Sequence, residues 1–307
     1  MADVKASDVK ALRDCIGAGM MDCKKALVEC NGNIEDAIDW LRKKGLAAAA
    51  KKSSRIAAEG LVGVAAEGRC GTIVEINAET DFVARNELFQ KYVKDVARIA
   101  YENNCTLEQL KALEYPGTGH SISEELTNLI AVIGENMEIR RVSHLAVSNG
   151  VVSSYVHSKV APTLGRIGVL VALESFGNQE KLLDLGKRIA MHIAASNPLS
   201  LSIADLDPVQ LQRERDVVAE QARSTGKPVE FIEKIQDGRI RKFYEEVVLL
   251  EQIFVLDNNS RVKDVISAAA QDVGAPVILK GYRKFVLGEG IERQTVDFAA
   301  DVAAQLK

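Results

Sequence analysis

The residues best able to act chemically are concentrated at positions 79–86, Glu-Thr-Asp-Phe-Val-Ala-Arg-Asn, where an aromatic side chain stands between charged ones. Asp81 could act on a bound partner or cap the helix that follows it. Phe82 could plug the protein's own core, which is the commoner role for such a residue, or anchor a partner at the surface. Nothing within these positions decides between the two roles.

Catalytic and cofactor chemistry has little support elsewhere in the chain. His157 follows a strand-like segment and could be a general base, but no nucleophile or carboxylate set accompanies it, so an ordinary hydrogen-bonding histidine is the simpler interpretation. The five cysteines form no CxxC pair, which indicates neither a disulfide framework nor a zinc site. Gly288 and Gly290 match neither common phosphate-loop spacing. We therefore expect a protein without a cofactor or a bound metal.

The bulk composition is that of an ordinary globular protein with more than one domain. A chain of 307 residues exceeds what one compact core usually holds, and 47% hydrophobic with 27% charged residues is typical of folded proteins. The net charge of −4 gives no general reason to expect nucleic acid as a partner. The N-terminus lacks the apolar core of a signal peptide, and no apolar run approaches the ~20 residues of a membrane helix. We expect a cytoplasmic protein that binds neither nucleic acid nor membrane directly.

The elements that position Asp81 and Phe82 can be predicted from the surrounding periodicity. Residues 71–77 alternate apolar and polar side chains and include β-branched ones, which predicts a strand. Apolar residues from Leu88 to Ala100 recur at intervals of three and four, which predicts an amphipathic helix. Asp81 and Phe82 therefore fall at the end of a strand or the start of a helix.

A second strand and helix of the same kind occur later in the chain. Residues 68–74, Gly-Arg-Cys-Gly-Thr-Ile-Val, match residues 165–171, Gly-Arg-Ile-Gly-Val-Leu-Val, and an Ile-Ala pair at 99–100 matches one at 193–194. Two related α+β subdomains, each a hairpin followed by a helix, explain the match. The second connector, Glu-Ser-Phe-Gly-Asn at 174–178, lacks the Asp-Phe pair, as expected where a function is added to one copy of a repeated frame.

The N-terminal segment predicts three short helices. Ser7 and Asn33 stand where N-caps belong, and Gly17, Gly32 and Gly45 follow the three helical patterns like residues that end a helix. Short loops between helices of this size favour a small bundle.

Helix geometry and composition also predict the placement of two methionines and the nature of the segment that follows the bundle. Neighbouring residues on a helix point about 100° apart, so Met20 and Met21 cannot both face one core. We expect at least one of them to fill the core and the other to be offered to another protein. Residues 46–58 are rich in Ala and Lys, which predicts a helical linker with a solvated charged face.

The second half of the chain adds a charged helical region and a final strand. Residues 208–250 predict an antiparallel helical hairpin that projects from a domain, or two ordinary packed helices. Residues 276–287 predict strands around a break, and apolar positions from Val296 to Leu306 predict a terminal helix. The expected fold is α+β, with units at 1–56, 57–148, 149–287 (including the hairpin at about 208–250) and 288–307.

Together these motifs resemble the bacterial translation elongation factor Ts family. The matching segments are Arg13 with Gly-Ala-Gly-Met-Met-Asp-Cys-Lys-Lys-Ala-Leu at 17–27, Thr-Asp-Phe-Val-Ala-Arg at 80–85, Ile-Gly-Glu-Asn at 133–136, Arg-Arg at 140–141, His-Ile-Ala-Ala at 192–195 and Gly-Glu-Gly-Ile at 288–291. They occur in the family's order and cover essentially the whole chain.

The resemblance implies a function and a set of site residues. The family is a guanine-nucleotide exchange factor for elongation factor Tu, which binds the GDP form of that GTPase, displaces its Mg²⁺ and releases GDP so that GTP can rebind. The segment that matches the family's Mg²⁺-displacing motif comprises Thr80, Asp81, Phe82 and Val83, with the Phe side chain between two helices of the nucleotide-binding domain. Further implied partner contacts are Arg13, Met20, Met21, Ile133, Gly134 and His157.

The resemblance also implies an architecture. The three N-terminal helices would form a ubiquitin-associated-like domain, the repeats a two-part core, residues 208–250 an antiparallel coiled coil, and the tail a separate C-terminal module. An insertion at 158–164 departs from the family's pattern and could re-aim the loop that carries His157.

Two other classes of function are alternatives. An interaction protein of chaperone or ubiquitin-associated type would use the N-terminal bundle alone, and a fragment ending near Ala57 would then keep its binding. An enzyme would use His157 or a cysteine, but no nucleophile elbow, metal-ligand spacing or phosphate loop supports that hypothesis.

Overall fold

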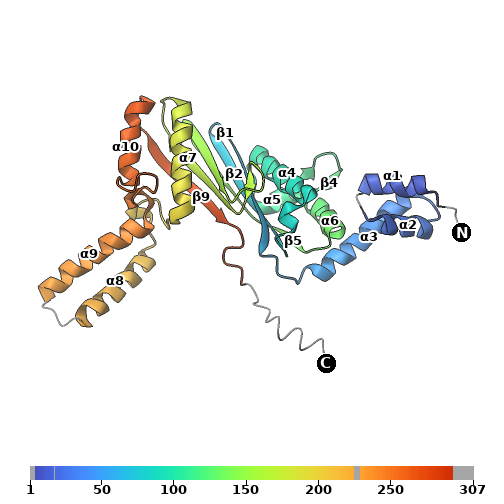
Figure 1. The fold of residues 1–307 in the computed structure, drawn as a ribbon, viewed down its shortest axis with the longest axis horizontal. Helices are drawn as coiled ribbons and strands as arrows, with labels where there is room; N and C mark the ends of the chain where they lie inside the picture. The colour runs from blue at the N-terminus through green and yellow to red at the C-terminus, as the bar shows by residue number, and fades with distance from the viewer. Residues whose placement is uncertain (1–3, 17, 225–228, 293–307) are drawn as a thin grey trace.

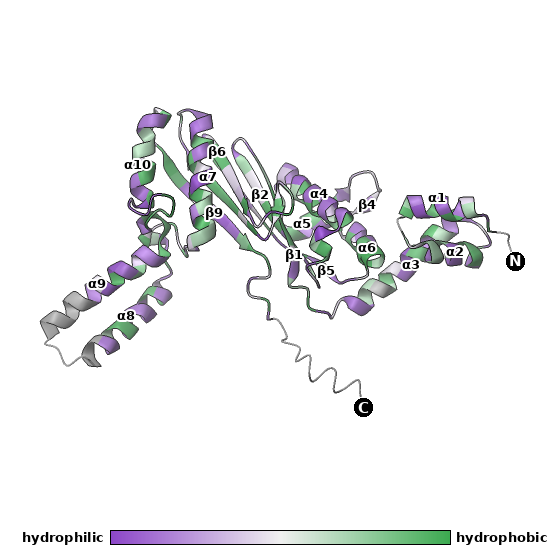
Figure 2. Ribbon diagram, viewed as in Figure 1, coloured by the Kyte–Doolittle hydropathy of each residue, from purple (hydrophilic) through white to green (hydrophobic). Residues whose placement is uncertain are grey.

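The computed structural model describes residues 4–16, 18–224 and 229–292, which combine helices with antiparallel sheets (Figure 1). This agrees with the expected α+β class. In Figure 2 hydrophobic residues dominate the strands of the central sheets, while the surrounding helices carry both polar and apolar residues. The described residues thus bury their apolar surface mainly where sheets and helices meet.

Three helices form the N-terminal unit: α1 (Ala6–Ile16), α2 (Met20–Glu29) and α3 (Ile34–Lys52). They pack around a small core that includes Leu12 and Leu27. Asn33 caps α3 as predicted, because its side-chain oxygen accepts the backbone N–H groups of Glu35 and Asp36.

The prediction that a helix ends at Gly45 is wrong. The alanine-rich segment after Gly45 has high helix propensity and continues α3 to Lys52. A Cβ atom at Gly45 would lie 3.2 Å from the Cβ of Ala131 on helix α6 (Ile122–Ile133). Glycine here permits close packing between two helices and does not end one. Gly17, the first predicted stop, lies outside the described residues.

The first sheet is antiparallel and has the strand order β5-β2-β1-β7. Its strands are β1 (Glu59–Glu67), β2 (Cys70–Ala78), β5 (Met137–Ala146) and β7 (Leu164–Gly165). Helices α4 (Glu87–Asn103) and α6 (Ile122–Ile133) cover one face, with Phe89 and Val93 buried in the core between them and the sheet. Helix α5 (Leu107–Ala112) and the short strands β3 (Glu114–Tyr115) and β4 (His120–Ser121) connect the two helices.

The second sheet is also antiparallel, with the order β6-β8-β9. Its strands are β6 (Gly150–His157), β8 (Ile167–Glu174) and β9 (Ile278–Val286), and helices α7 (Gln179–Ser196) and α10 (Val262–Val273) cover its outer face. Residues 276–287 contribute one strand, because a register shift opposite Ala172 and Leu173 replaces the predicted break.

A hairpin followed by a helix occurs twice in the described residues. We call β1, β2 and α4 the first copy, and β6, β8 and α7 the second copy. The sheets of the two copies face each other, and the helices of each copy lie on the outside (Figure 1). The insertion after His157 does not leave the body of the protein, because β7 adds to the edge of the first sheet beside β1.

A third core lies between the two sheets, and a glycine from each copy lets the sheets come close. A Cβ atom on Gly71 would lie 2.8 Å from Val152, and one on Gly168 would lie 2.7 Å from Val62. Real Cβ atoms avoid such distances. The matching glycines of the repeat therefore have matching structural roles, each facing the strands of the other copy.

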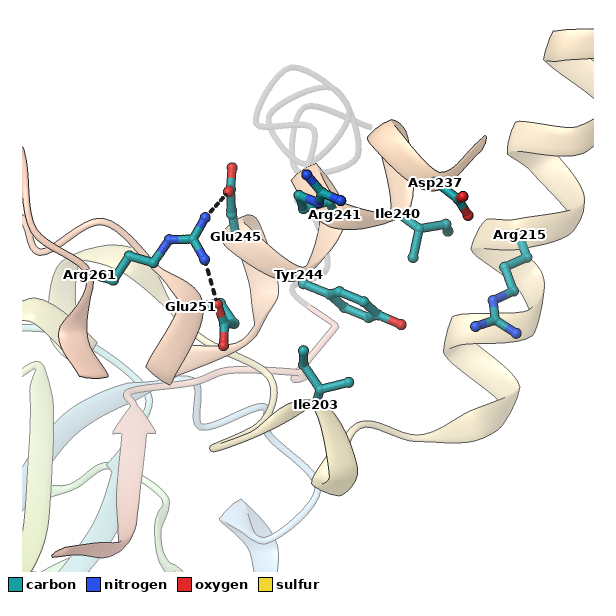
Figure 3. A pocket seen from close by; sticks show the side chains of 9 residues that line it. All are labelled: Ile203, Arg215, Asp237, Ile240, Arg241, Tyr244, Glu245, Glu251 and Arg261. Atoms are coloured by element: carbon teal, nitrogen blue, oxygen red, sulfur yellow. Dashed lines mark hydrogen bonds and ion pairs between the residues drawn. The ribbon is translucent and has the colours of Figure 1, made fainter. Parts of the chain in front are cut away.

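A helical hairpin projects from the side of the second copy (Figure 1). It consists of α8 (Pro208–Ser224) and α9 (Val229–Val247), preceded by the turn η2 (Ile203–Asp205) and followed by η3 (Leu249–Glu251). At its base Arg261 pairs with Glu245 at 2.5 Å and with Glu251 at 2.8 Å (Figure 3). Figure 3 also shows the Tyr244 side chain of α9 lying between Ile203 of η2 and Arg215 of α8.

The end of the described chain returns to the first copy. The backbone N–H of Gly288 donates to Glu75 on β2 at 2.8 Å. Glu75 has 0% exposure and also pairs with Arg140 at 3.0 Å and Arg141 at 2.5 Å. The predicted terminal helix at 296–306 lies outside the described residues, and of the predicted module 288–307 only 288–292 are described.

None of the helices in the described parts of the chain is both long enough and apolar enough to cross a membrane.

A candidate protein-binding site on two loops

The connector between β2 and α4 holds Phe82 outward. Val83 and Ala84 are buried at 3% and 8% exposure, whereas the Phe82 side chain is 77% exposed. Val83 begins the turn η1 (Val83–Arg85), whose backbone accepts and donates local hydrogen bonds with residues 81–86. Phe82 is therefore not a plug for the protein's own core, and Val83 fastens the connector beside it.

Asp81 is exposed and is not the cap of α4. The side-chain oxygen of Asn86 accepts the backbone N–H groups of Leu88 at 2.9 Å and Phe89 at 3.3 Å, so Asn86 has that role. The second interpretation of Asp81 as a helix cap is thus wrong, and its carboxylate stands beside an outward-facing aromatic ring.

A second loop comes from the end of α6. Gly134 ends this helix with φ +91°, a left-handed conformation that favours glycine, and Ile133 and Gly134 are half-buried. The next residue, Glu135, accepts the backbone N–H of Thr80 at 2.9 Å and the Thr80 hydroxyl at 2.7 Å. The structure therefore joins the loop that directly follows Ile133 and Gly134 to Thr80, although the two segments are far apart in the sequence.

The remaining predicted contacts lie elsewhere. Arg13 is exposed on α1, and Met20 and Met21 are 49% and 76% exposed on α2. The expectation that at least one of the two methionines fills the core is wrong, because Leu27 and Cys23 of the same helix occupy it. His157 is exposed at the end of β6, where its Nδ1 lies 3.1 Å from the Tyr155 hydroxyl.

The insertion after His157 is tied down locally. Ser158 has φ +50°, and the backbone N–H of Arg166 donates to the His157 carbonyl at 3.2 Å. Gly165 fits against this turn, since a Cβ atom there would lie 2.6 Å from Val156. Gly165 and Arg166, directly after the insertion, thus hold the backbone of His157 at the start of β8.

Sequence reasoning missed two outward-facing apolar side chains. Leu88 is 51% exposed at the start of α4, although its periodicity assigned it to the core. The same argument used for the two methionines could have found it, because its neighbour Phe89 occupies the buried face. Phe176, in the second connector, is 85% exposed. The match between the two copies could have indicated this exposure, because Phe176 lies in the segment that corresponds to the Phe82 connector.

The first connector presents charged and aromatic side chains to the solvent. The exposed residues of the first connector are Asp81, Phe82 and Arg85, and no nucleophile and base are in hydrogen-bond contact among them. Within the described residues no group of three His, Cys, Asp or Glu side chains is arranged to hold a metal ion. An exposed aromatic ring on a fixed backbone is typical of an anchor in a protein interface.

Comparison with known proteins gives one consistent family. The elongation factor TS family model matches residues 79–289. Similar curated proteins, each named elongation factor Ts, include those of Rhodospirillum centenum (60% identical over 304 residues, 99% of each chain) and Paramagnetospirillum magneticum (57% over 305 residues, 99% of this chain and 98% of the other). That of Rhodospirillum rubrum is 56% identical over 308 residues and 100% of each chain. Because both the family model and these near-full-length relatives agree, the chain belongs to the elongation factor Ts family.

Proposed function

We propose that this protein is a guanine-nucleotide exchange factor for elongation factor Tu in the cytoplasm. It binds the GDP form of that GTPase, displaces Mg²⁺ and promotes GDP release so that GTP can rebind during translation elongation. The observation that carries the proposal is the connector in which Phe82 is 77% exposed between the exposed Asp81 and the buried Val83. The family's Thr-Asp-Phe-Val motif coincides with this connector.

The proposed mechanism is thermodynamic linkage without covalent chemistry. A GTPase holds GDP tightly in part because Mg²⁺ neutralises phosphate charge, so a displaced metal weakens the nucleotide as well. The Phe82 ring enters between two helices of the nucleotide-binding domain, and the neighbouring Asp81 is brought into the interface with it. A factor that prefers the nucleotide-free state by ~1.4 kcal/mol lowers nucleotide affinity about tenfold, and the nucleotide weakens the factor by the same ratio.

One aromatic ring does not supply the whole effect. Burial of a Phe side chain contributes roughly 1.5–3 kcal/mol, which corresponds to one or two powers of ten in affinity. We therefore include in the interface the exposed Arg13, Met20 and Met21 of the N-terminal unit, which we interpret as ubiquitin-associated-like. Ile133 and Gly134 beside Thr80, and His157 at the end of β6, complete it. No nucleic acid is needed for this function.

The test follows the release of fluorescent GDP from elongation factor Tu after addition of excess unlabelled GDP. We expect the release rate to rise with the concentration of this protein and to reach a plateau. A parallel series with Mg²⁺ removed by a chelator should show a smaller acceleration, because the metal is then already absent. An unchanged release rate at saturating protein would contradict the proposal, and an equal acceleration with and without Mg²⁺ would contradict its metal-displacing step.

A further inference from the structure

Two loops near Phe82 are joined by reciprocal hydrogen bonds, in which a Glu carboxylate of each loop accepts a backbone N–H of the other. Glu135 of the loop after α6 accepts the backbone N–H of Thr80 at 2.9 Å, and Glu79 of the connector accepts the backbone N–H of Asn136 at 2.5 Å. The Thr80 hydroxyl donates to the other oxygen of Glu135 at 2.7 Å. We call Glu79, Thr80, Glu135 and Asn136 the two-loop cluster.

The connector needs such a restraint because its own ring provides none. Phe82 is 77% exposed, so packing of the ring does not fix the backbone that carries it. On the C-terminal side the buried Val83 and the cap at Asn86 hold the chain. On the N-terminal side β2 ends at Ala78. The next points of attachment are the hydrogen bonds that Glu135 accepts from Thr80 and that Glu79 accepts from the backbone N–H of Asn136.

The linker from the N-terminal unit joins the same cluster. The Asn136 side chain, at 9% exposure, donates to the backbone carbonyl of Arg55 at 2.7 Å. The Arg55 guanidinium also lies 3.4 Å from Glu79, but its side chain is 55% exposed, and such ion pairs contribute little. The amide-to-carbonyl bond is therefore the firmer tie between the linker and the two loops.

We propose that Glu135 and Glu79 are positioning residues that fix the Asp81-Phe82 connector before the partner binds; this inference rests on the proposed exchange function. A connector fixed in advance loses little conformational freedom when Phe82 enters the partner. Without the two-loop cluster, the connector would lose its conformational freedom at the step in which Phe82 enters the partner, and this step would become slower. The other surfaces still bring the two proteins together. The plateau rate of nucleotide release should therefore fall more than the half-saturating concentration rises.

Three variants separate the contributions of the two hydrogen bonds between Glu135 and Thr80: Glu135→Ala, Glu135→Gln and Thr80→Val. Glu135→Ala removes both hydrogen bonds to Thr80, and hydrogen bonds to charged groups are strong enough that we expect the plateau rate to fall about tenfold or more. Glu135→Gln keeps one acceptor oxygen and Thr80→Val removes only the hydroxyl donor, so both should lose several-fold. Glu138→Gln is the matched control, because Glu138 is an exposed carboxylate on the adjoining strand β5. We expect it to match the wild type.

A second readout does not depend on nucleotide release. Hydrogen exchange of a peptide spanning residues 78–83 in the free protein should be faster in Glu135→Ala than in Glu138→Gln, at equal thermal midpoints. If Glu135→Ala lowers the thermal midpoint, the milder Glu135→Gln and Thr80→Val decide the question in the same two measurements.

The outcomes are distinct. A lower plateau rate and faster hydrogen exchange in the Glu135 variants support the positioning role. A plateau rate and hydrogen exchange equal to those of Glu138→Gln would overturn it. If the wild type fails to accelerate GDP release, the proposed function is wrong; hydrogen exchange alone then shows whether Glu135 fixes the connector.

Discussion

In the first copy the chain leaves β2 at Ala78 and enters α4 at the cap Asn86, whereas in the second copy it leaves β8 at Glu174 and enters α7 at the cap Asn178. Both helices also end at an Asn in the left-handed conformation, Asn104 and Asn197. The helices and strands of the two copies therefore begin and end alike. What differs is the length of the connector and the segments that hold it.

The two connectors both expose a Phe side chain but are held by different elements. Phe82 follows the two-loop cluster, while Phe176 lies between the buried Ser175 and Gly177, where a Cβ atom would lie 2.3 Å from Val273 of α10. An exposed aromatic ring alone thus does not distinguish the copies. The distinction lies in the carboxylate of Asp81 next to Phe82 and in the neighbouring loop from α6.

The outer helices α4 and α7 also differ, in whether an equivalent position is exposed or buried. Arg98 of α4 is exposed and pairs with Glu102 at 2.7 Å, whereas His192, at the equivalent position of α7, is fully buried. His192 lies 2.9 Å from Gln252 and accepts the backbone N–H of Val255, so it joins α7 to the segment after the hairpin. The same frame therefore serves as a surface in one copy and as an attachment point in the other.

The largest expected effect comes from exchanging each aromatic ring for alanine. Phe82→Ala should slow nucleotide exchange roughly 10–100-fold, because burial of a Phe in the partner contributes roughly 1.5–3 kcal/mol. Phe176→Ala should change exchange less than about twofold, and neither variant should lower the thermal midpoint, since both rings are exposed. A loss for Phe176→Ala as large as that for Phe82→Ala would mean that both copies bind the partner.

The glycines between the sheets should have the next largest effect, on stability. Gly168→Ala and Gly71→Ala should each lower the free energy of unfolding by about 1–3 kcal/mol, because the added methyl group overpacks the core between the copies. Urea denaturation measures the change. Gly238→Ala, at an exposed position of α9 with open space around it, should not destabilise. If either sheet glycine tolerated alanine like Gly238, the close approach of the sheets would not depend on it.

The two Asn caps should separate stability from exchange. Asn86→Ala and Asn178→Ala should each cost about 1 kcal/mol in unfolding free energy, because each helix loses the side chain that accepts its first N–H groups. Only Asn86→Ala should also slow nucleotide exchange, since Asn86 holds the C-terminal side of the Phe82 connector. Equal exchange rates in the two variants would show that this side of the connector needs no cap.

The smallest effect, visible only in acid, concerns His192. Burial lowers the pKa of His192 below its ordinary value of 6.5, so the unfolded state binds more protons than the folded state below that pH. This contribution to stability is complete above about pH 6.5 and is lost as the pH falls through the lowered value. His192→Gln should therefore show a smaller loss of urea midpoint between pH 7.5 and 5.5 than the wild type. A parallel loss in both proteins would contradict the assignment.

Much of the fold could be predicted because its signals are local. The strand at 71–77 and the helix after Asn86 follow from periodicity, and both are present in the structure. The repeated residues 71–74 and 168–171 lie on strands β2 and β8. Helix α10 was missed because its N-cap position holds Arg261, whose side chain makes no capping hydrogen bond. Gly45 was misinterpreted because glycine favours both helix ends and close helix packing, and only the position of α6 distinguishes the two.

The candidate site was predictable only in part. The resemblance supplied Thr80 to Val83 and Ile133 with Gly134, but no local pattern shows that they meet. Glu135 and Thr80 are 55 positions apart in sequence, and an isolated Glu after a helix-ending glycine is usually a solvated residue. The exposure of Phe82 also needed the structure, because the core around Val83 and Phe89 decides which ring remains outside.

The contact between Glu75 and Gly288 has a consequence for how the protein is made. Glu75 belongs to the first copy, but its last hydrogen-bond donor lies 213 residues later, and β9 supplies the third strand of the second sheet just before it. During synthesis the buried carboxylate and its two arginines must wait for β9 and Gly288, the latter made 213 residues after Glu75, before the cluster is complete. A chain truncated before Gly288 would therefore expose an incompletely satisfied charge cluster to the quality-control proteases of the cell.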